Sequence, residues 1–239
     1  MKAVTWQGFR SISVDEVEDP IIKESNDAII KVTSTNICGS DLHLYETMGA
    51  FMSTGDVLGH EAIGIVLEVG SEVSQIRPGD RVVVPFQINC GHCRACLRGV
   101  TGSCAELPLM AMYGMAPLAG LDGGGFMSDL VLVPFADAML LTVPDGLDPV
   151  AIASLSDNIP DGWRTVGPYS AELAALGEVD RRVLVVGRRS IGLYAAAFGM
   201  AYGAQVDYVD TDQQRLAMAE KLGAQVHDRP KPDKAWDPY

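Results

Sequence analysis

The sequence has little positive charge and no long apolar run. It carries 18 Lys and Arg against 31 Asp and Glu, which gives a formal charge of −13. A nucleic acid or an anionic membrane surface requires a basic face, so we expect neither as a partner. The longest largely apolar stretch, residues 191–204, contains three glycines and is shorter than the roughly 20 residues of a membrane-spanning helix. Residues 1–7 contain no apolar signal segment, and we therefore expect a cytoplasmic protein.

Cysteine is scarce and unevenly placed. Only five are present, and four of them lie within fifteen residues, in the pattern Cys-x2-Cys-x2-Cys-x7-Cys: Cys90, Cys93, Cys96 and Cys104. Disulfides are the alternative, but a reducing compartment and spacings of three residues disfavour them. Four thiolates from one loop are typical of a closed, tetrahedral structural zinc, with an iron–sulfur cluster as the lesser alternative. Arg94 and Arg98 would offset the net negative charge of such a site.

A length of 239 residues allows one large domain or two small ones. Before residue 150, helical periodicity is rare, and short β-branched segments alternate with polar or Gly/Pro breaks. Strands are therefore expected at residues 4–6, 12–14, 28–33, 62–69, 81–85 and 130–134. The first part of the chain should be mostly β.

A different pattern follows after about residue 180. A buried-type strand at 183–186 leads through a glycine turn into an apolar helix at 191–200. A second strand at 206–209 ends at Asp210, and a helix is expected at 213–222. This order predicts a parallel βαβ unit of the dinucleotide-binding type.

The glycine turn is an imperfect dinucleotide motif. Its first and third glycines are present, but Arg189 stands where the middle glycine is expected, and together with Arg188 it can either contact a phosphate or block it. Asp210, eighteen residues beyond the last glycine, should bind the ribose 2′-hydroxyl and so favour NAD over NADP. The predicted cofactor-binding turn comprises Gly187, Arg188, Arg189, Ser190, Ile191 and Gly192.

A second set of possible metal ligands lies in residues 37–73. Cys38 and His60 occur there among carboxylates, glycines and β-branched residues. Zinc accepts sulfur and nitrogen together, and a catalytic zinc uses three protein ligands with a fourth position open. Taken singly, Cys38 and His60 are better explained by a buried structural cysteine and a surface Gly-His-Glu turn.

Two motifs together resemble one family. The pattern Gly-His-Glu-x2-Gly-x5-Gly-x2-Val over residues 59–73 resembles the signature of the zinc-containing medium-chain alcohol dehydrogenases. Residues 38–43, Cys-Gly-Ser-Asp-Leu-His, resemble the first ligand segment of that family. The resemblance implies an α/β plus β fold. A GroES-like β-barrel catalytic domain would span residues 1–155, with a structural zinc lobe at 89–104, and a partial Rossmann doubly wound domain would span 156–239.

The resemblance also implies a ligand set for a catalytic zinc. Residues 155–160, Leu-Ser-Asp-Asn-Ile-Pro, resemble the third ligand segment of formaldehyde-dehydrogenase-like members, which implies Cys38, His60 and Asp157 as ligands. One thiolate and one carboxylate would leave a Zn²⁺ site neutral. Glu61 would lie beside the metal as an alternate ligand. Asp161 departs from the pattern, because the family often has Thr there, near the nicotinamide.

Other roles follow from the same resemblance. Ser40 would take the hydroxyl proton of the substrate and His43 would pass it outward. Asp41 would accept a hydrogen bond from the other ring nitrogen of His60. Arg215 matches the basic residue beside the ribose. The implied reaction is hydride transfer between an alcohol or hydrated aldehyde and NAD, with two Zn²⁺ per chain, in a homodimer or homotetramer.

Three further expectations remain open. The same chemistry would serve a zinc polyol or threonine dehydrogenase. A zinc-stabilised binding protein, or a truncated inactive dehydrogenase, would keep the metal sites without turnover. No strand is expected beyond residue 227, so the Rossmann domain supplies about half of the roughly six strands of a doubly wound sheet. Either the chain is a fragment or truncated variant, or the sequence lacks residues of the native protein.

Overall fold

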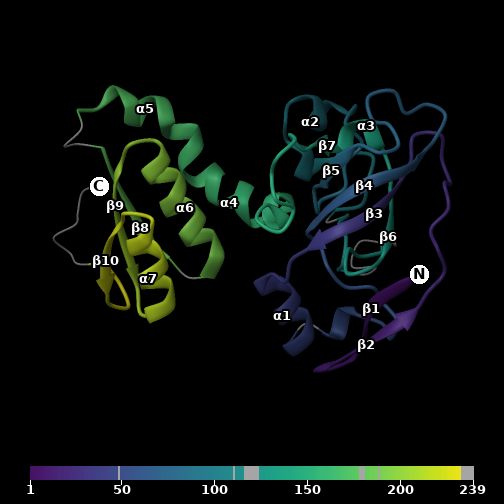
Figure 1. The fold of residues 1–239 in the computed structure, drawn as a ribbon, viewed down its shortest axis with the longest axis horizontal. Helices are drawn as coiled ribbons and strands as arrows, with labels where there is room; N and C mark the ends of the chain where they lie inside the picture. Colours follow the sequence, from purple (N-terminus) through teal and green to yellow (C-terminus); the bar gives the residue numbers. More distant parts are fainter. Residues whose placement is uncertain (48, 110, 116–123, 178–180, 188, 233–239) are drawn as a thin grey trace. The chain divides into compact units, whose positions relative to one another are not determined.

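The computed structural model describes residues 1–47, 49–109, 111–115, 124–177, 181–187 and 189–232. The chain divides into two compact units, Met1–Asp157 and Asn158–Tyr239 (Figure 1). The sequence-predicted boundary, between residues 155 and 156, stays a prediction. Each unit has its own core. None of the helices in the described part of the chain has the length and apolar composition that crossing a bilayer requires.

The first unit is mostly β, as predicted. Its strands are β1 (Lys2–Gly8), β2 (Ser11–Glu16), β3 (Ala28–Thr35), β4 (Ala62–Val69), β5 (Arg81–Val84), β6 (Leu130–Val133) and β7 (Leu141–Thr142). Its helices and 3-10 turns are α1 (Gly39–Glu46), η1 (Gly49–Phe51), α2 (Arg94–Leu97), η2 (Thr101–Ser103), α3 (Ala136–Met139) and η4 (Ala153–Ser156).

One antiparallel sheet organises this unit. Its strand order is β6-β3-β4-β5-β7, while β1 and β2 form a separate antiparallel pair. Alternating apolar residues of β3, β4 and β5, among them Ile30, Val66 and Val82, are fully or almost fully buried in one core. Gly64 of β4 lies so close to β3 that an added Cβ would sit 2.4 Å from Ile30 Cγ2 and 2.7 Å from the Lys31 carbonyl oxygen. Close contact between the two strands therefore requires glycine at this position.

Helix α1 is a feature that the sequence reasoning missed. It buries only Asp41 and Leu44, so it lacks the apolar periodicity that indicates a helix. Its first turn is stabilised by the Asp41 carboxylate, which accepts a hydrogen bond of 2.7 Å from the Cys38 backbone N–H. Polar groups near Cys38, more than an apolar stripe, thus define the start of this helix.

The second unit contains the predicted βαβ arrangement. Its elements are α4 (Asn158–Val166), η5 (Gly167–Tyr169), α5 (Ser170–Ala175), β8 (Arg182–Val186), α6 (Arg189–Ala201), β9 (Gln205–Asp210), α7 (Gln213–Lys221) and β10 (Gln225–Asp228). The three strands are parallel, in the order β10-β9-β8. Val185, Tyr208 and Ala196 are buried in the core that joins this sheet to α6. The third strand, β10, lies where the sequence analysis expected the last strand of this unit, with none beyond residue 227.

Candidate active site

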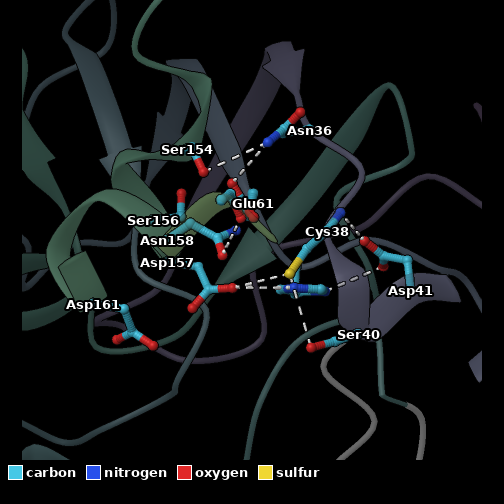
Figure 2. A network of polar contacts seen from close by, with 12 residues as sticks. Asn36, Cys38, Ser40, Asp41, Glu61, Ser154, Ser156, Asp157, Asn158 and Asp161 are labelled. Atoms are coloured by element: carbon cyan, nitrogen blue, oxygen red, sulfur yellow. Dashed lines mark hydrogen bonds and ion pairs between the residues drawn. The ribbon is translucent and has the colours of Figure 1, made fainter. Parts of the chain in front are cut away.

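Four groups that can bind a metal meet in the first unit. One ligand atom each from Cys38, His60, Glu61 and Asp157 lies within 4.8 Å of the others. Figure 2 shows the Cys38 thiol and the Asp157 carboxylate pointing toward each other from opposite sides of the cluster. The structure therefore brings together the three predicted zinc ligands and the predicted alternate ligand.

These donors come from three separate segments. Cys38 immediately precedes α1, His60 and Glu61 immediately precede β4, and Asp157 immediately follows η4. Gly59 has a φ of +95°, and a Cβ there would lie 2.6 Å from Met127, so only glycine fits before His60. Ser156 joins η4 to β4, because its Oγ donates to the Ala62 carbonyl at 3.0 Å and accepts from the Ala62 N–H at 2.9 Å.

The spacing of the donors fits zinc. His60 Nε2 lies 3.4 Å from Asp157 Oδ2, and Cys38 Sγ lies 3.6 Å from the same oxygen. Ligands at ordinary Zn–N, Zn–O and Zn–S bond lengths in a tetrahedron lie about 3.4 Å (N to O) and about 3.6 Å (S to O) apart. A thiol, an imidazole and a carboxylate in this arrangement match the donor set of a zinc site.

His60 is the central group electrostatically. It is buried, and neither ring nitrogen forms a hydrogen bond of normal geometry, although Nδ1 lies 3.2 Å from Asp41 Oδ1. Burial lowers the pKa of His60, but the neighbouring Asp157 and Asp41 carboxylates raise it by more, to about 12. Because the surrounding anions stabilise positive charge at this position, the pocket favours a cation. Asp41 lies at the ring nitrogen that faces away from Asp157, where the sequence analysis predicted it.

Glu61 is buried completely and has partners that the sequence analysis did not identify. Its Oε2 accepts a 3.4 Å hydrogen bond from Asn36 Nδ2, and the same amide nitrogen lies 3.5 Å from Ser154 Oγ. Burial raises the pKa of Glu61, and the nearby Asp157 charge adds to that rise. No spaced motif contains Asn36 or Ser154. Only their closeness in sequence to Cys38 and Asp157 could have indicated that they lie near the site.

The predicted proton-transfer residues lie at the outer edge of the cluster. Ser40 Oγ is 3.8 Å from Cys38 Sγ, and both Ser40 and His43 belong to α1. Both residues are exposed to solvent. Ser40 is therefore adjacent to the cluster while His43 is accessible to bulk water.

The other four cysteines form a second cluster. Their sulfur atoms lie within 4.8 Å of one another, and no disulfide joins them. Cys96 Sγ lies 3.5 Å from Cys93 Sγ and 3.9 Å from Cys90 Sγ. In a tetrahedral zinc–thiolate site, neighbouring sulfurs are separated by about 3.8 Å. The segment that carries them was predicted as a loop, and the short α2 and η2 are additional structure within it.

Backbone N–H groups support these thiols. The Cys93 N–H donates to Cys90 Sγ at 3.3 Å, and the Ala105 N–H donates to Cys93 Sγ at 3.5 Å. The contact with Ala105 lowers the pKa of Cys93 to about 6, whereas burial raises the pKa of Cys96 to about 12. Four thiols packed this closely require a cation before all of them can ionise.

The second unit contains the predicted dinucleotide turn. Gly187 and Gly192 leave no room for a side chain: a Cβ on Gly187 would lie 2.5 Å from the Tyr208 ring, and one on Gly192 would lie 2.7 Å from Gly187 Cα. Both glycines therefore serve close packing of the helix against the strands. Arg188 lies outside the described residues.

The residue in the place of the middle glycine has a left-handed backbone. Arg189 has a φ of +67°, a conformation that glycine adopts without strain and other residues rarely adopt. Its side chain is exposed. Ser190 donates a 3.1 Å hydrogen bond to Asn158 Oδ1, and Ile191 is 38% exposed. The two predicted alternatives for Arg189, phosphate contact and obstruction, both stay predictions.

Asp210 ends β9 as predicted, and Arg215 binds it. Arg215 Nε donates to Asp210 Oδ2 at 2.7 Å, and Nη2 donates to Oδ1 at 3.1 Å. Backbone N–H groups of Thr211 and Asp212 donate to Oδ1 at 2.7 and 3.1 Å. Chiefly through Arg215, the pKa of Asp210 is lowered to about 2. A carboxylate held charged at this strand end is suited to accept hydrogen bonds from ribose hydroxyls.

Comparison with known families supports the resemblance. The family model described as alcohol dehydrogenase GroES-like domain matches residues 24–145. The medium chain reductase/dehydrogenase ucsI of Acremonium sp is 34% identical over 97% of this chain and 77% of its own length. The glutathione-independent formaldehyde dehydrogenase of Pseudomonas aeruginosa is 36% identical over 93% of this chain, which spans 56% of that enzyme.

Solved structures agree on the fold. The alcohol dehydrogenase TADH from Thermus sp. ATN1 superposes with a TM-score of 0.84 at 33% identity, covering 95% of this chain and 63% of TADH. A zinc-binding dehydrogenase from Sinorhizobium meliloti, solved with NADP, has a TM-score of 0.70 at 30% identity, covering 94% of this chain and 60% of its own. The predicted fold, a GroES-like domain followed by part of a Rossmann domain, is confirmed. The chain spans less than two thirds of most of these relatives.

Proposed function

Because the chain belongs to the zinc-containing medium-chain alcohol dehydrogenase family, we propose that it carries the catalytic site of an oxidoreductase that transfers hydride between an alcohol, or a hydrated aldehyde, and NAD. The observation that carries this proposal is the convergence of Cys38, His60 and Asp157. Their donor atoms come from three distant segments and have the spacings of a zinc site.

Cys38, His60 and Asp157 would hold the catalytic zinc, and the four clustered cysteines would hold a structural zinc, two per chain. When bound, the catalytic zinc supplies Lewis acidity, which lowers the pKa of a substrate hydroxyl. Asp41 keeps the His60 ring oriented, because its carboxylate lies 3.2 Å from Nδ1. A thiolate and a carboxylate balance the charge of the metal, so the buried site remains neutral.

Ser40 and His43 would move the substrate proton. Ser40 Oγ lies next to the Cys38 sulfur, close enough to accept a proton from a hydroxyl bound in the cluster. His43, exposed on the same helix, can pass that proton to water.

The cofactor proposal rests on Asp210. A charged carboxylate at the end of β9 favours a ribose 2′-hydroxyl and repels a 2′-phosphate, so NAD is the proposed cofactor and NADP the weaker one. The similarity to formaldehyde dehydrogenase supports hydrated short aldehydes among the substrates. Assembly into a homodimer or homotetramer, and a cytoplasmic location, remain expectations.

The proposal is tested by removing one ligand. In His60→Ala, oxidation of short alcohols and hydrated formaldehyde with NAD should fall by at least about a thousandfold, as expected when several kcal/mol of charge stabilisation is lost. The zinc content should fall from two per chain to one. We call the group of Cys38, His60, Glu61 and Asp157 the mixed cluster. His92→Gln, which alters a histidine outside it, is the matched control and should retain the activity and both zincs. Unchanged activity in His60→Ala would refute the assignment.

A second candidate is a zinc-stabilised binding protein that does not use NAD. The strained backbone of Arg189, in place of a glycine, favours this alternative. The two candidates differ in dinucleotide binding, which the intrinsic tryptophan fluorescence of the chain can report. If two zincs bind but NAD at about 1 mM causes no quenching, the binding-protein function is favoured; saturable quenching favours the dehydrogenase.

A further inference from the structure

The mixed cluster presents one ligand more than an active zinc requires. Four donors, from Cys38, His60, Glu61 and Asp157, lie within 4.8 Å of one another. A zinc that binds all four would be closed in the manner of a structural site, whereas a catalytic zinc keeps one position open. The chain therefore needs some means of keeping one of the four donors away from the metal.

The Glu61 carboxylate contacts polar side chains that lie outside the four-residue cluster. Its carboxylate accepts from Asn36 Nδ2 at 3.4 Å, and the hydroxyl of Ser154, itself buried, also lies in this network (Figure 2). The backbone of Glu61 is held as well, because Thr35 Oγ1 donates to its carbonyl oxygen at 2.7 Å. Cys38 and Asp157, by contrast, face each other across the cluster.

The scaffold keeps these partners in place. Asn36 follows directly on β3, and Ser154 lies in η4, which Ser156 ties to β4 by two hydrogen bonds to Ala62. Figure 2 shows Asn36 and Ser154 on the side of Glu61 away from Ser40. A fully buried carboxylate must find polar partners, and Asn36 and Ser154 are placed to supply them.

We propose that Asn36 and Ser154 are positioning residues that hold the Glu61 carboxylate out of the coordination sphere and so keep one position of the mixed site open. This inference rests on the proposed zinc site. Charge favours the same arrangement: with Cys38 and Asp157 alone the site is neutral, and a third anion would leave a buried net charge of −1. Asn36 and Ser154 set the balance between an open, reactive site and a closed one.

The test uses the full-length chain with Co²⁺ in place of zinc, because the visible spectrum of cobalt reports its ligands. In the unaltered protein, added azide should shift the spectrum of the mixed site. In Asn36→Ala/Ser154→Ala, Glu61 should close the site, so azide should bind at least about tenfold more weakly and a chelator should remove the metal about tenfold more slowly. Asn26→Ala is the control for loss of an asparagine elsewhere in the unit.

A third substitution separates positioning from general damage. Adding Glu61→Gln to the double variant removes the carboxylate, so azide binding should return toward that of the unaltered protein. Unchanged azide binding in the double variant, or no recovery on adding Glu61→Gln, would overturn the inference. Failure of the unaltered chain to bind cobalt at the mixed site would instead refute the proposed function itself.

Discussion

The two candidate metal sites of the first unit differ in how the chain assembles them. The four cysteines lie within fifteen residues, so local turns and the short helix α2 are enough to bring them together. Cys38 and Asp157 are 119 residues apart, and they meet only because β3, β4 and η4 pack against one another. One cluster depends on local conformation and the other on the core of the unit.

The clusters also differ in their supporting contacts. The thiols accept hydrogen bonds from backbone N–H groups of their own loop. The mixed cluster is surrounded by side chains, including Asp41, Asn36 and Ser156, each placed by a different element. We therefore expect substitutions in the four-cysteine cluster to act on stability and substitutions around the mixed cluster to act on reactivity.

The largest expected effect comes from removing a donor of the mixed cluster. Asp157→Ala should lower dehydrogenase activity by at least about a thousandfold, because it removes one of the three proposed ligands of the metal that stabilises charge. Metal analysis should find one zinc per chain, that of the cysteines. Asp161→Ala, which removes a nearby carboxylate that pairs with Arg164 and is not a proposed ligand, is the control and should keep two zincs. If Asp157→Ala still binds two zincs per chain, Asp157 is not required to hold the metal of the mixed cluster.

Breaking the four-cysteine cluster should act on stability. Cys96→Ser should lower the free energy of unfolding by more than about 4 kcal/mol, because a structural zinc contributes its binding energy directly to folding. Chemical denaturation monitored by circular dichroism measures this change. Ser103→Ala, an exposed position of the same lobe, should be nearly neutral. If both variants lose the same free energy of unfolding, the four cysteines do not stabilise the fold by binding a metal.

A smaller effect should follow from disturbing the β3–β4 contact. A Cβ on Gly64 would overlap Ile30 and the Lys31 carbonyl, so Gly64→Ala should cost about 1–3 kcal/mol and loosen the mixed cluster. In Gly102→Ala the new Cβ meets only the end of the Gln87 side chain, at 3.0 Å, and little change is expected. Thermal unfolding and zinc content of the two variants, compared side by side, check this prediction. Selective loss of the cysteine-bound zinc in Gly64→Ala would be the contrary result.

The smallest expected effect concerns the second unit, where the ion pair of Arg215 and Asp210 stabilises the end of β9. Arg215 lowers the pKa of Asp210 to about 2, so the stabilisation from this pair is present above pH 4 or so and is lost as the pH falls through about 2. In Arg215→Ala the pKa of Asp210 should rise, and acid unfolding of this unit should begin at higher pH. Fluorescence of Trp163 during acid titration, measured in a Trp6→Phe/Trp236→Phe background, gives the shift. An unchanged acid midpoint would show that Asp210 does not depend on Arg215.

Much of this arrangement could be predicted from short-range patterns. Strand β4 has the predicted bounds, 62–69, because its β-branched run is bordered by glycine and charged residues. The glycines at 187 and 192 and the acid at 210 indicated the βαβ unit that the structure contains. Helix α1 was not predicted, because it buries too few apolar residues to show periodicity.

The surroundings of Glu61 were beyond sequence reasoning for a different reason. Asn36 and Ser154 are 118 residues apart, and neither belongs to a spaced motif. Their contact exists only once β3 and η4 pack on β4. The left-handed backbone of Arg189 is likewise visible only in three dimensions, since the sequence showed merely that a glycine was absent.

By itself the sequence determined the mostly β first unit and the parallel second unit, and it predicted the candidate metal donors, because residue type, spacing and periodicity follow from local chemistry. Only the tertiary structure decided which donors lie within reach of one metal and which side chains restrain Glu61. Those relations depend on the packing of strands that are distant along the chain, and no local pattern encodes the distances between them.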